Sequence, residues 1–294
     1  MKTIYLDYNA STPLDSKVSD RVCEVLNQFG NPSSTHSFGR DARDILDTTK
    51  AIIAQILGAS PAQIILTSSG SEANNHILKS ISLSYIQKEQ PVHIITSPIE
   101  HPCVLNTCEW LSEFPNVDIS FLPVLSSGIV STDTLSDLIR SDTRIISVMA
   151  ANNETGMIQP IDTLSQIAYD HGILFHTDAV QIFGKIPFTL NLATIDFLTL
   201  SGHKLYGPKG IAAMYVKNDD SLPPFIHGGS QERHRRAGTE NIPAIAGFGC
   251  ALEHFSDPNM TAISTLRDTL LTTIQTRIPD VVVNGDLSDC LPNT

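Results

Sequence analysis

Short runs of apolar, mostly β-branched residues alternate along this chain with longer amphipathic stretches. The runs are Ile64–Thr67, Val92–Thr96, Ile145–Met149, Ile173–Thr177, Ile195–Leu200 and Ile211–Val216. Helix-like segments separate them, among them Asp41–Leu57, Ala73–Gln87 and Thr163–His171. Apolar strands that alternate with helices are typical of a parallel sheet covered on both faces. The pattern therefore predicts an α/β fold with a mostly parallel sheet.

The two ends of the chain do not follow this alternation. A long helix is expected at Thr261–Ile278, followed by a short strand at Val281–Val283. We expect residues 13–257 to form one large α/β domain. Residues 1–12 and 258–294 are expected to form an N-terminal arm and part of a smaller, incomplete C-terminal domain.

The charge and hydropathy of the chain limit the kinds of partner that it can bind. The 294 residues include 19 basic and 31 acidic side chains, which give a net charge of −12. An acidic surface repels polyanions, so nucleic-acid binding is not expected. No apolar run approaches the roughly 20 residues that cross a bilayer, and the N-terminus lacks the layout of a signal peptide. We expect a cytoplasmic protein that binds no membrane.

Five cysteines occur in the sequence, an odd number without any CxxC spacing. Neither a disulfide framework nor a thiolate metal site is therefore expected. Cys103 and Cys108 lie near His101, which would also suit a nucleophile or a metal ligand. Free cysteines are more often small buried apolar residues, and helix packing is the expected role of both.

Polar and small residues follow the ends of five of the expected strands. Their sequences are SSGSE at 68–72, EH at 100–101, NNETG at 152–156, HTDAVQ at 176–181 and SGHK at 201–204. In an open α/β sheet, ligands bind beyond the carboxyl ends of the strands. The sequence therefore predicts one ligand site at that edge.

The residues Ser69, Gly70 and Ser71 fit a phosphate site. Small side chains let backbone N–H groups approach the anion at the start of a helix, where the helix dipole adds to the attraction. The alternative is a Ser/Gly turn that only caps the helix.

Three further side chains suit a planar, aldehyde-bearing cofactor. Asp178 would be costly to bury unless it met a cation such as a protonated pyridine nitrogen, although a structural salt bridge is the alternative. Lys204, held in a glycine-rich turn, would become an amine nucleophile if desolvated, whereas an exposed lysine would only be solvated. His101 could stack on such a ring or be an ordinary core or surface residue. Their joint occurrence favours the cofactor.

Eight segments together resemble the class V aminotransferase group of pyridoxal 5′-phosphate (PLP) enzymes, and within it the cysteine desulfurases of the NifS/IscS type. They are YLDYNASTP (5–13), GNPSSTHSFGR (30–40), LTSSGSEANN (66–75), EHPCVLNTC (100–108), NNETGMIQPI (152–161), HTDAVQ (176–181), SGHKLYGPKG (201–210) and HGGSQERHRRAGTEN (227–241). The similarity runs nearly end to end. It implies the PLP-dependent transferase fold of type I.

The resemblance implies roles for the residues around the cofactor ring. Lys204 would form the Schiff base with PLP and remove the α-proton of the substrate. Asp178 would pair with the pyridine nitrogen, while Gln181 and Asn153 would contact the ring oxygen. Asn153 would also contact the substrate carboxylate. His101 would stack on the ring and shuttle protons.

The resemblance also implies a phosphate site and a homodimer. Gly70, Ser71, Ser201 and His203 would hold the phosphate. Thr239 would reach the phosphate of the other subunit, so that each active site would be shared.

The reaction implied by the resemblance converts L-cysteine into L-alanine and leaves a persulfide on an enzyme cysteine. The sulfur would pass to an acceptor, such as an iron–sulfur scaffold protein or a thiolated cofactor. The family's persulfide cysteine follows a stretch like LPNT, which stands here at 291–294. We therefore expect a C-terminally truncated relative that binds PLP but lacks turnover.

Two other functions remain open from the sequence. One is a non-catalytic PLP-binding remnant that dimerises with, or modulates, a full-length relative. The other is a different class V enzyme, such as a selenocysteine lyase or an aminotransferase. The EHPCVL and NNETG segments favour the NifS/IscS branch over these enzymes.

Overall fold

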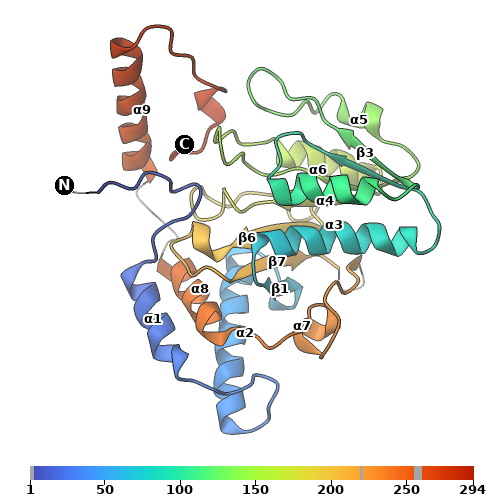
Figure 1. The fold of residues 1–294 in the computed structure, drawn as a ribbon, viewed down its shortest axis with the longest axis vertical. Helices are drawn as coiled ribbons and strands as arrows, with labels where there is room; N and C mark the ends of the chain where they lie inside the picture. Colours follow the sequence, from blue (N-terminus) through green and yellow to red (C-terminus); the bar gives the residue numbers. More distant parts are fainter. Residues whose placement is uncertain (1–2, 219–220, 255–259) are drawn as a thin grey trace.

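The computed structural model describes residues 3–218, 221–254 and 260–294, and its centre is a seven-stranded sheet (Figure 1). The strand order is β1-β7-β6-β5-β4-β2-β3. Strand β7 runs antiparallel to β1 and β6, whereas the other pairings between these strands are parallel. The carboxyl ends of the six remaining strands therefore meet at one edge of the sheet. The strands are β1 (Ile64–Thr67), β2 (Val92–Thr96), β3 (Val117–Phe121), β4 (Thr143–Ser147), β5 (Leu174–Asp178), β6 (Phe197–Ser201) and β7 (Ala212–Val216).

All six apolar runs of the alternating pattern form strands, with boundaries that differ by at most two residues at either end. Strand β3 was not predicted, because it lies at the sheet edge and mixes buried Val117 with exposed Asp118 and Phe121. The predicted strand at Val281–Val283 is wrong. That segment pairs with no strand, and Val282 is 82% exposed.

Helices cover both faces of the sheet (Figure 1). One core contains residues of α3 (Gly70–Ile86) and α4 (Pro102–Ser112) together with every second strand residue, such as Ile65. The other core contains residues of α2 (Ser37–Leu57), α6 (Ile161–Asp170) and α8 (Ile242–His254). Neighbouring residues of a strand point to opposite faces, and both faces are buried here. Continuous apolar runs, without polar alternation, therefore predicted these strands correctly.

Side-chain caps explain why two helices begin earlier than predicted. Ser69 accepts a hydrogen bond from the Glu72 N–H, so α3 begins at Gly70 rather than Ala73. His36 accepts from the Gly39 N–H, so α2 begins at Ser37 rather than Asp41. Each cap satisfies an N–H that has no partner within its helix.

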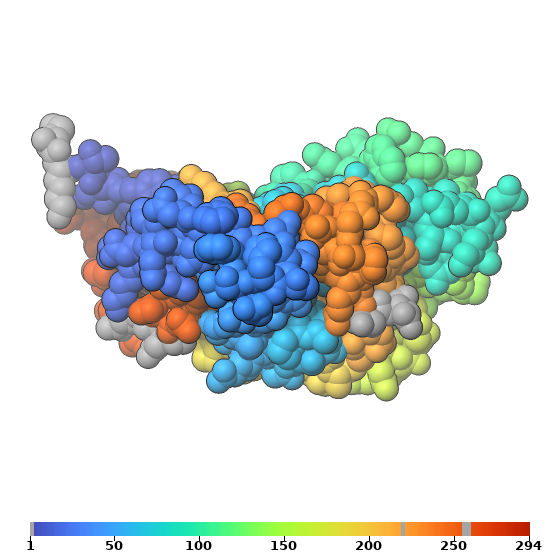
Figure 2. Space-filling model, turned by 90° about the horizontal axis from the view of Figure 1, so that it is seen from below, coloured from blue at the N-terminus to red at the C-terminus, as the bar shows by residue number. Residues whose placement is uncertain are grey.

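The remaining helices complete the fold. Helix α1 (Ser16–Leu26) packs on α8, and Figure 2 shows α1 and α2 next to the segment of α7 and α8 on one face. The short helices are α5 (Leu135–Leu138) and α7 (Gln231–His234). Across the described residues, no helix combines the length and apolar character needed to span a bilayer.

Helix α9 (Met260–Arg277) stands beside the sheet, close to the start of the chain (Figure 1). None of its described residues is buried. The chain then returns to the sheet edge, where the Ile158 N–H donates to the Asp289 carbonyl and the Leu291 N–H to the Gly156 carbonyl, both at 2.8 Å. The expected domain boundary at 257/258 lies outside the described residues.

Candidate active site

A cavity of about 290 Å³ lies at the carboxyl edge of the sheet. Nine of the residues predicted from the sequence line it: Gly70, Ser71, His101, Asn153, Asp178, Gln181, Ser201, His203 and Lys204. The tenth, Thr239, is exposed and does not line the cavity. Segments more than 100 residues apart thus converge because parallel strands end at the same edge.

The start of α3 provides an anion-binding end of this cavity. The Gly70 and Ser71 N–H groups lie in the first turn of a 17-residue helix, where no intrahelical acceptor is available. Glu72, in the same turn, receives two bonds from Arg236, at 2.7 and 3.1 Å. Burial acts to raise the pKa of Glu72, but bonds from Arg236 and Ser68 lower it overall. The guanidinium neutralises this carboxylate, so it does not repel an anion nearby.

A buried carboxylate lies elsewhere in the cavity wall. Asp178 ends β5, and its Oδ2 accepts a 2.7 Å bond from Asn74 Nδ2 while its Oδ1 accepts from the Val180 N–H at 3.0 Å. Burial raises the pKa of Asp178, and these bonds and the charges of His101 and Lys204 oppose the rise. Asp178 forms no ion pair with any residue that the structure describes. A protonated pyridine nitrogen is a suitable cation for such a carboxylate.

Lys204 brings an amine to the cavity from the turn after β6. Its Nζ donates to the carbonyls of Asn9 and Ala10 in the N-terminal arm, the latter at 3.0 Å. Burial lowers the pKa of Lys204, while Asp178 and Asp7 act to raise it. A lowered pKa increases the neutral fraction of the amine, which is the form that attacks aldehydes.

His101 precedes α4 and caps it. Its Nδ1 accepts the Cys103 N–H at 3.1 Å, so the neutral ring carries its proton on Nε2. Proline at the first helical position favours this start, because its missing N–H has no partner there anyway. The exposed ring can therefore offer Nε2–H to a ligand in the cavity.

Cys103 also lines the cavity, which sequence reasoning missed because it assigned this residue to helix packing. Its Sγ lies 3.0 Å from His101 Nδ1 and 3.2 Å from Asn74 Nδ2. Burial raises the pKa of the Cys103 thiol to about 11. Cys108 is buried in the core between α3 and α4, in agreement with the packing role expected of it.

Three other polar residues of the predicted site segments make hydrogen bonds within the fold and do not line the cavity. His176 lies between Ser147 and Thr199 in the sheet interior, and burial lowers its pKa to about 3. Glu100 accepts from Ser97 and from the Met149 N–H, and burial raises its pKa to about 8. Asn152 closes the following turn by accepting from two backbone N–H groups.

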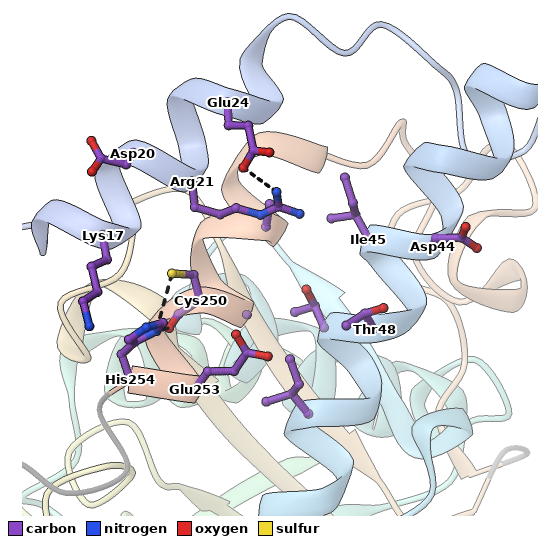
Figure 3. Close-up of a pocket in the computed structure, with 14 residues that line it drawn as sticks. Lys17, Asp20, Arg21, Glu24, Asp44, Ile45, Thr48, Cys250, Glu253 and His254 are labelled. Carbon is purple, nitrogen blue, oxygen red and sulfur yellow. Dashed lines mark hydrogen bonds and ion pairs between the residues drawn. The ribbon is translucent and has the colours of Figure 1, made fainter.

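A larger groove of about 830 Å³ lies between α1, α2 and α8 (Figure 3). Its charged side chains carry both signs, and Arg21 pairs with Glu24 at 2.6 Å. Cys250 Sγ lies 3.7 Å from His254 Nδ1 on the same helix. This contact and the Arg21–Glu24 pair are both exposed. None of the predicted site residues lines this groove, whereas nine of them line the smaller cavity, so the smaller cavity is the candidate active site.

The comparisons with known proteins identify the family of the chain. The family profile described as aminotransferase class-V matches residues 4–285. A cysteine desulfurase IscS from Dictyoglomus turgidum is 43% identical over 296 residues, which are 99% of this chain and 74% of that protein. A cysteine desulfurase from a Nostoc species is 42% identical over 298 residues, with 100% and 74% covered.

Solved structures give the same answer. A NifS-like protein superposes with a TM-score of 0.93 at 35% identity, covering 99% of this chain and 80% of that one. A structure described as SspA in complex with cysteine gives a TM-score of 0.86 at 38% identity, with 92% and 78% covered.

The fold and the site thus define a PLP-dependent enzyme of fold type I, as predicted. The chain belongs to the class-V aminotransferase family, in its cysteine desulfurase branch. PLP is the cofactor of this family. The chain spans 74% of the length of the two relatives described above.

Proposed function

We propose that the chain binds PLP in the 290 Å³ cavity, with Lys204 as the attachment point and L-cysteine as the amino acid that the bound cofactor receives. The observation that carries this proposal is the convergence of three features: a lysine with a lowered pKa, a buried carboxylate without a described cation, and an open helix N-terminus. The cysteine complex of a structural neighbour supports L-cysteine as the substrate.

The cavity residues divide the work of holding the cofactor. The N–H groups of Gly70 and Ser71 are suited to the phosphate, and Ser201 and His203 complete that end. Asp178 would hold the protonated pyridine nitrogen. The ring oxygen and the ring face would be met by the remaining polar residues of the wall, which are Gln181, Asn153 and His101.

When bound, PLP supplies an electron sink for charge that develops at the substrate α-carbon. Lys204 would supply the amine to which PLP attaches, and it would accept the α-proton once the substrate amine had displaced it; its lowered pKa increases the neutral fraction that both roles need. His101 presents Nε2–H and can exchange a proton with the departing sulfur, because Nδ1 is engaged with the α4 backbone. Asn153 is suited to bond the substrate carboxylate.

The cavity offers no thiol that is well suited to accept the sulfur among the described residues. Cys103 is the cavity-lining thiol among the described residues, and burial keeps it protonated. A thiol, unlike a thiolate, is a poor nucleophile. The polypeptide of residues 1–294 is therefore proposed to bind PLP without sustained desulfurase turnover. The same observation favours a second candidate, a PLP-binding subunit that dimerises with, or modulates, a full-length relative.

Further parts of the proposal follow the family resemblance. The protein would be a cytoplasmic homodimer that delivers sulfur to an acceptor such as an iron–sulfur scaffold. The exposed Thr239 would reach the phosphate site of the second subunit, and its loop is anchored by the bond from Arg236 to Glu72. Residues 13–257 would form the large domain, and residues 1–12 with 258–294 the arm and part of the small one.

Covalent trapping tests the central proposal. The chain is incubated with PLP, reduced with borohydride, digested and mapped by mass spectrometry. We expect the label on Lys204, none after Lys204→Ala, and an unchanged label after Lys209→Ala, which alters an exposed lysine of the same segment. L-Cysteine should change the absorbance of the bound cofactor. A wild-type chain that traps no PLP would refute the proposal.

A further inference from the structure

Lys185 is a buried lysine close to the cofactor cavity. Its residue is only 7% exposed, and it forms no ion pair with a described carboxylate. Its Nζ donates instead to Gln181 Oε1 at 2.6 Å and to Asn9 Oδ1 at 3.2 Å. Lys185 and Lys204 line one neighbouring cavity of about 480 Å³. Burying an amine against two neutral amides is costly, so a specific role is worth seeking.

These contacts determine which way the Gln181 side chain faces. An amide has one acceptor and one donor end, and a lysine ammonium can only donate. Gln181 must therefore turn Oε1 toward Lys185, which turns its Nε2–H₂ group the other way. There Nε2 donates to the Asn9 carbonyl at 3.1 Å. The same carbonyl accepts from Lys204 Nζ, so the donor end of the amide lies next to the reacting amine.

We infer that Lys185 is a positioning residue, which fixes the Gln181 amide with its donor end toward Lys204 and the ring oxygen of the cofactor. This inference rests on the proposed function, because it takes Gln181 as the partner of that oxygen. Without Lys185, only the Asn9 carbonyl, which accepts from Nε2, would favour this orientation among the described contacts of the amide. A flipped amide would place Gln181 Oε1, an acceptor, against the ring oxygen of the cofactor, which is also an acceptor.

The protonation state of Lys185 does not undo this arrangement. Burial, followed by the charge of Lys204, lowers the pKa of Lys185 to about 7. A neutral amine keeps two N–H bonds, which is the number needed for Gln181 Oε1 and Asn9 Oδ1. The neutral amine also gains a lone pair that could accept a bond, but the Asn9 carbonyl still requires the donor end of the amide, so the same orientation is favoured on both sides of that pH.

Three variants test the inference without relying on turnover. Lys185→Met removes the donor at similar length, Lys185→Arg keeps donors, and Lys209→Met is the exposed control. The measurements are the PLP dissociation constant and the pH midpoint at which the bound cofactor changes colour. We expect Lys185→Met to weaken PLP binding roughly tenfold and to raise the midpoint, since the ring oxygen loses a donor. Lys185→Arg should restore much of both, and Lys209→Met should change neither.

A double-mutant cycle with Gln181→Ala shows whether Lys185 acts through that amide. In the Gln181→Ala background, Lys185→Met should change the PLP dissociation constant less than about twofold and should leave the pH midpoint close to that of Gln181→Ala alone. A purely structural lysine would instead lower thermal stability equally in both backgrounds and leave the colour midpoint in place. This inference alone is overturned if the effects of Lys185→Met and Gln181→Ala on PLP binding are fully additive. It is also overturned if Lys185→Met changes neither the dissociation constant nor the pH midpoint while the wild type is still labelled at Lys204. A wild type that traps no PLP overturns the proposed function as well.

Discussion

Asn74 Nδ2 donates a 2.7 Å hydrogen bond to Asp178 Oδ2 in the interior, and this bond ties α3 to the end of β5. The residues are 104 positions apart, and both are buried. Burial disfavours the charge of Asp178, and the amide bond is one of the interactions that favour it. Asn74 therefore helps to keep the carboxylate ionised and oriented toward the cavity.

Replacing Asn74 with leucine, which has a similar size, should weaken PLP binding about tenfold, because a hydrogen bond to a charged group contributes about 1.5–3 kcal/mol. The measurement is an absorbance titration of the apoprotein with PLP. Asp178→Asn should weaken binding more, since it removes the charge itself. Equal affinities of the wild type and Asn74→Leu would show that Asp178 does not need this partner.

The cysteines should differ strongly in reactivity. Cys23 is exposed and should react quickly with a thiol reagent, whereas Cys103 and Cys108 should react slowly because burial raises their pKa values to about 11 and 12. Timed labelling and peptide mapping check this order.

For the same reason, the 294-residue polypeptide with PLP and L-cysteine should not produce alanine and sulfide steadily. Sustained production that Cys103→Ala abolishes would instead identify Cys103 as the acceptor of the sulfur. Production that survives this substitution would place the acceptor elsewhere.

Glu100 should make the protein less stable at higher pH. Its folded pKa, about 8, exceeds the ordinary glutamate pKa of 4.5, so the folded state holds a proton that the unfolded state releases. Its contribution is complete below about pH 4.5 and is lost as the pH rises toward 8. Urea unfolding of the wild type and Glu100→Gln at pH 5 to 8.5 tests this.

Because other groups also titrate in this range, the difference between the two curves is the relevant quantity. That difference should change with pH by at most about 1.4 kcal/mol per unit, in favour of the variant at high pH. Parallel curves would mean that Glu100 does not bind an additional proton in the folded state.

His234 adopts a φ of +65°, which is unfavourable for a residue with a side chain. It is exposed, and it follows Glu232 and Arg233, which have positive φ as well. His234→Gly should increase the free energy of unfolding by roughly 0.5–1 kcal/mol, since glycine adopts this conformation without strain. Denaturant melts of this variant and of His227→Gly, an exposed control without positive φ, would show the difference. An equal effect in both variants would contradict the explanation.

Most of the fold and most of the site residues could be predicted from local sequence patterns. Each buried strand, such as Ile64–Thr67, is a continuous apolar run, and the polar residues directly after it mark where the chain leaves the sheet. The parallel arrangement then brings those ends together, so nine of ten predicted site residues could be named before their distances were known. Strand β3 escaped prediction because an edge strand has one neighbour and a mixed burial pattern.

Only the tertiary structure decided which side chains support that site. Asn9 and Asn74 lie in segments that carry the family resemblance, but no role was predicted for them or for Lys185, because these roles depend on contacts across 104 to 176 residues. Cys103 packs against the core and also lines the cavity, and this double position depends on where the start of α4 lies in the fold. Sequence periodicity reports how a residue relates to its near neighbours in the chain. Hydrogen-bond partners and burial depend instead on how distant elements pack, and that is where the pKa values of Asp178, Lys204 and Cys103 are set.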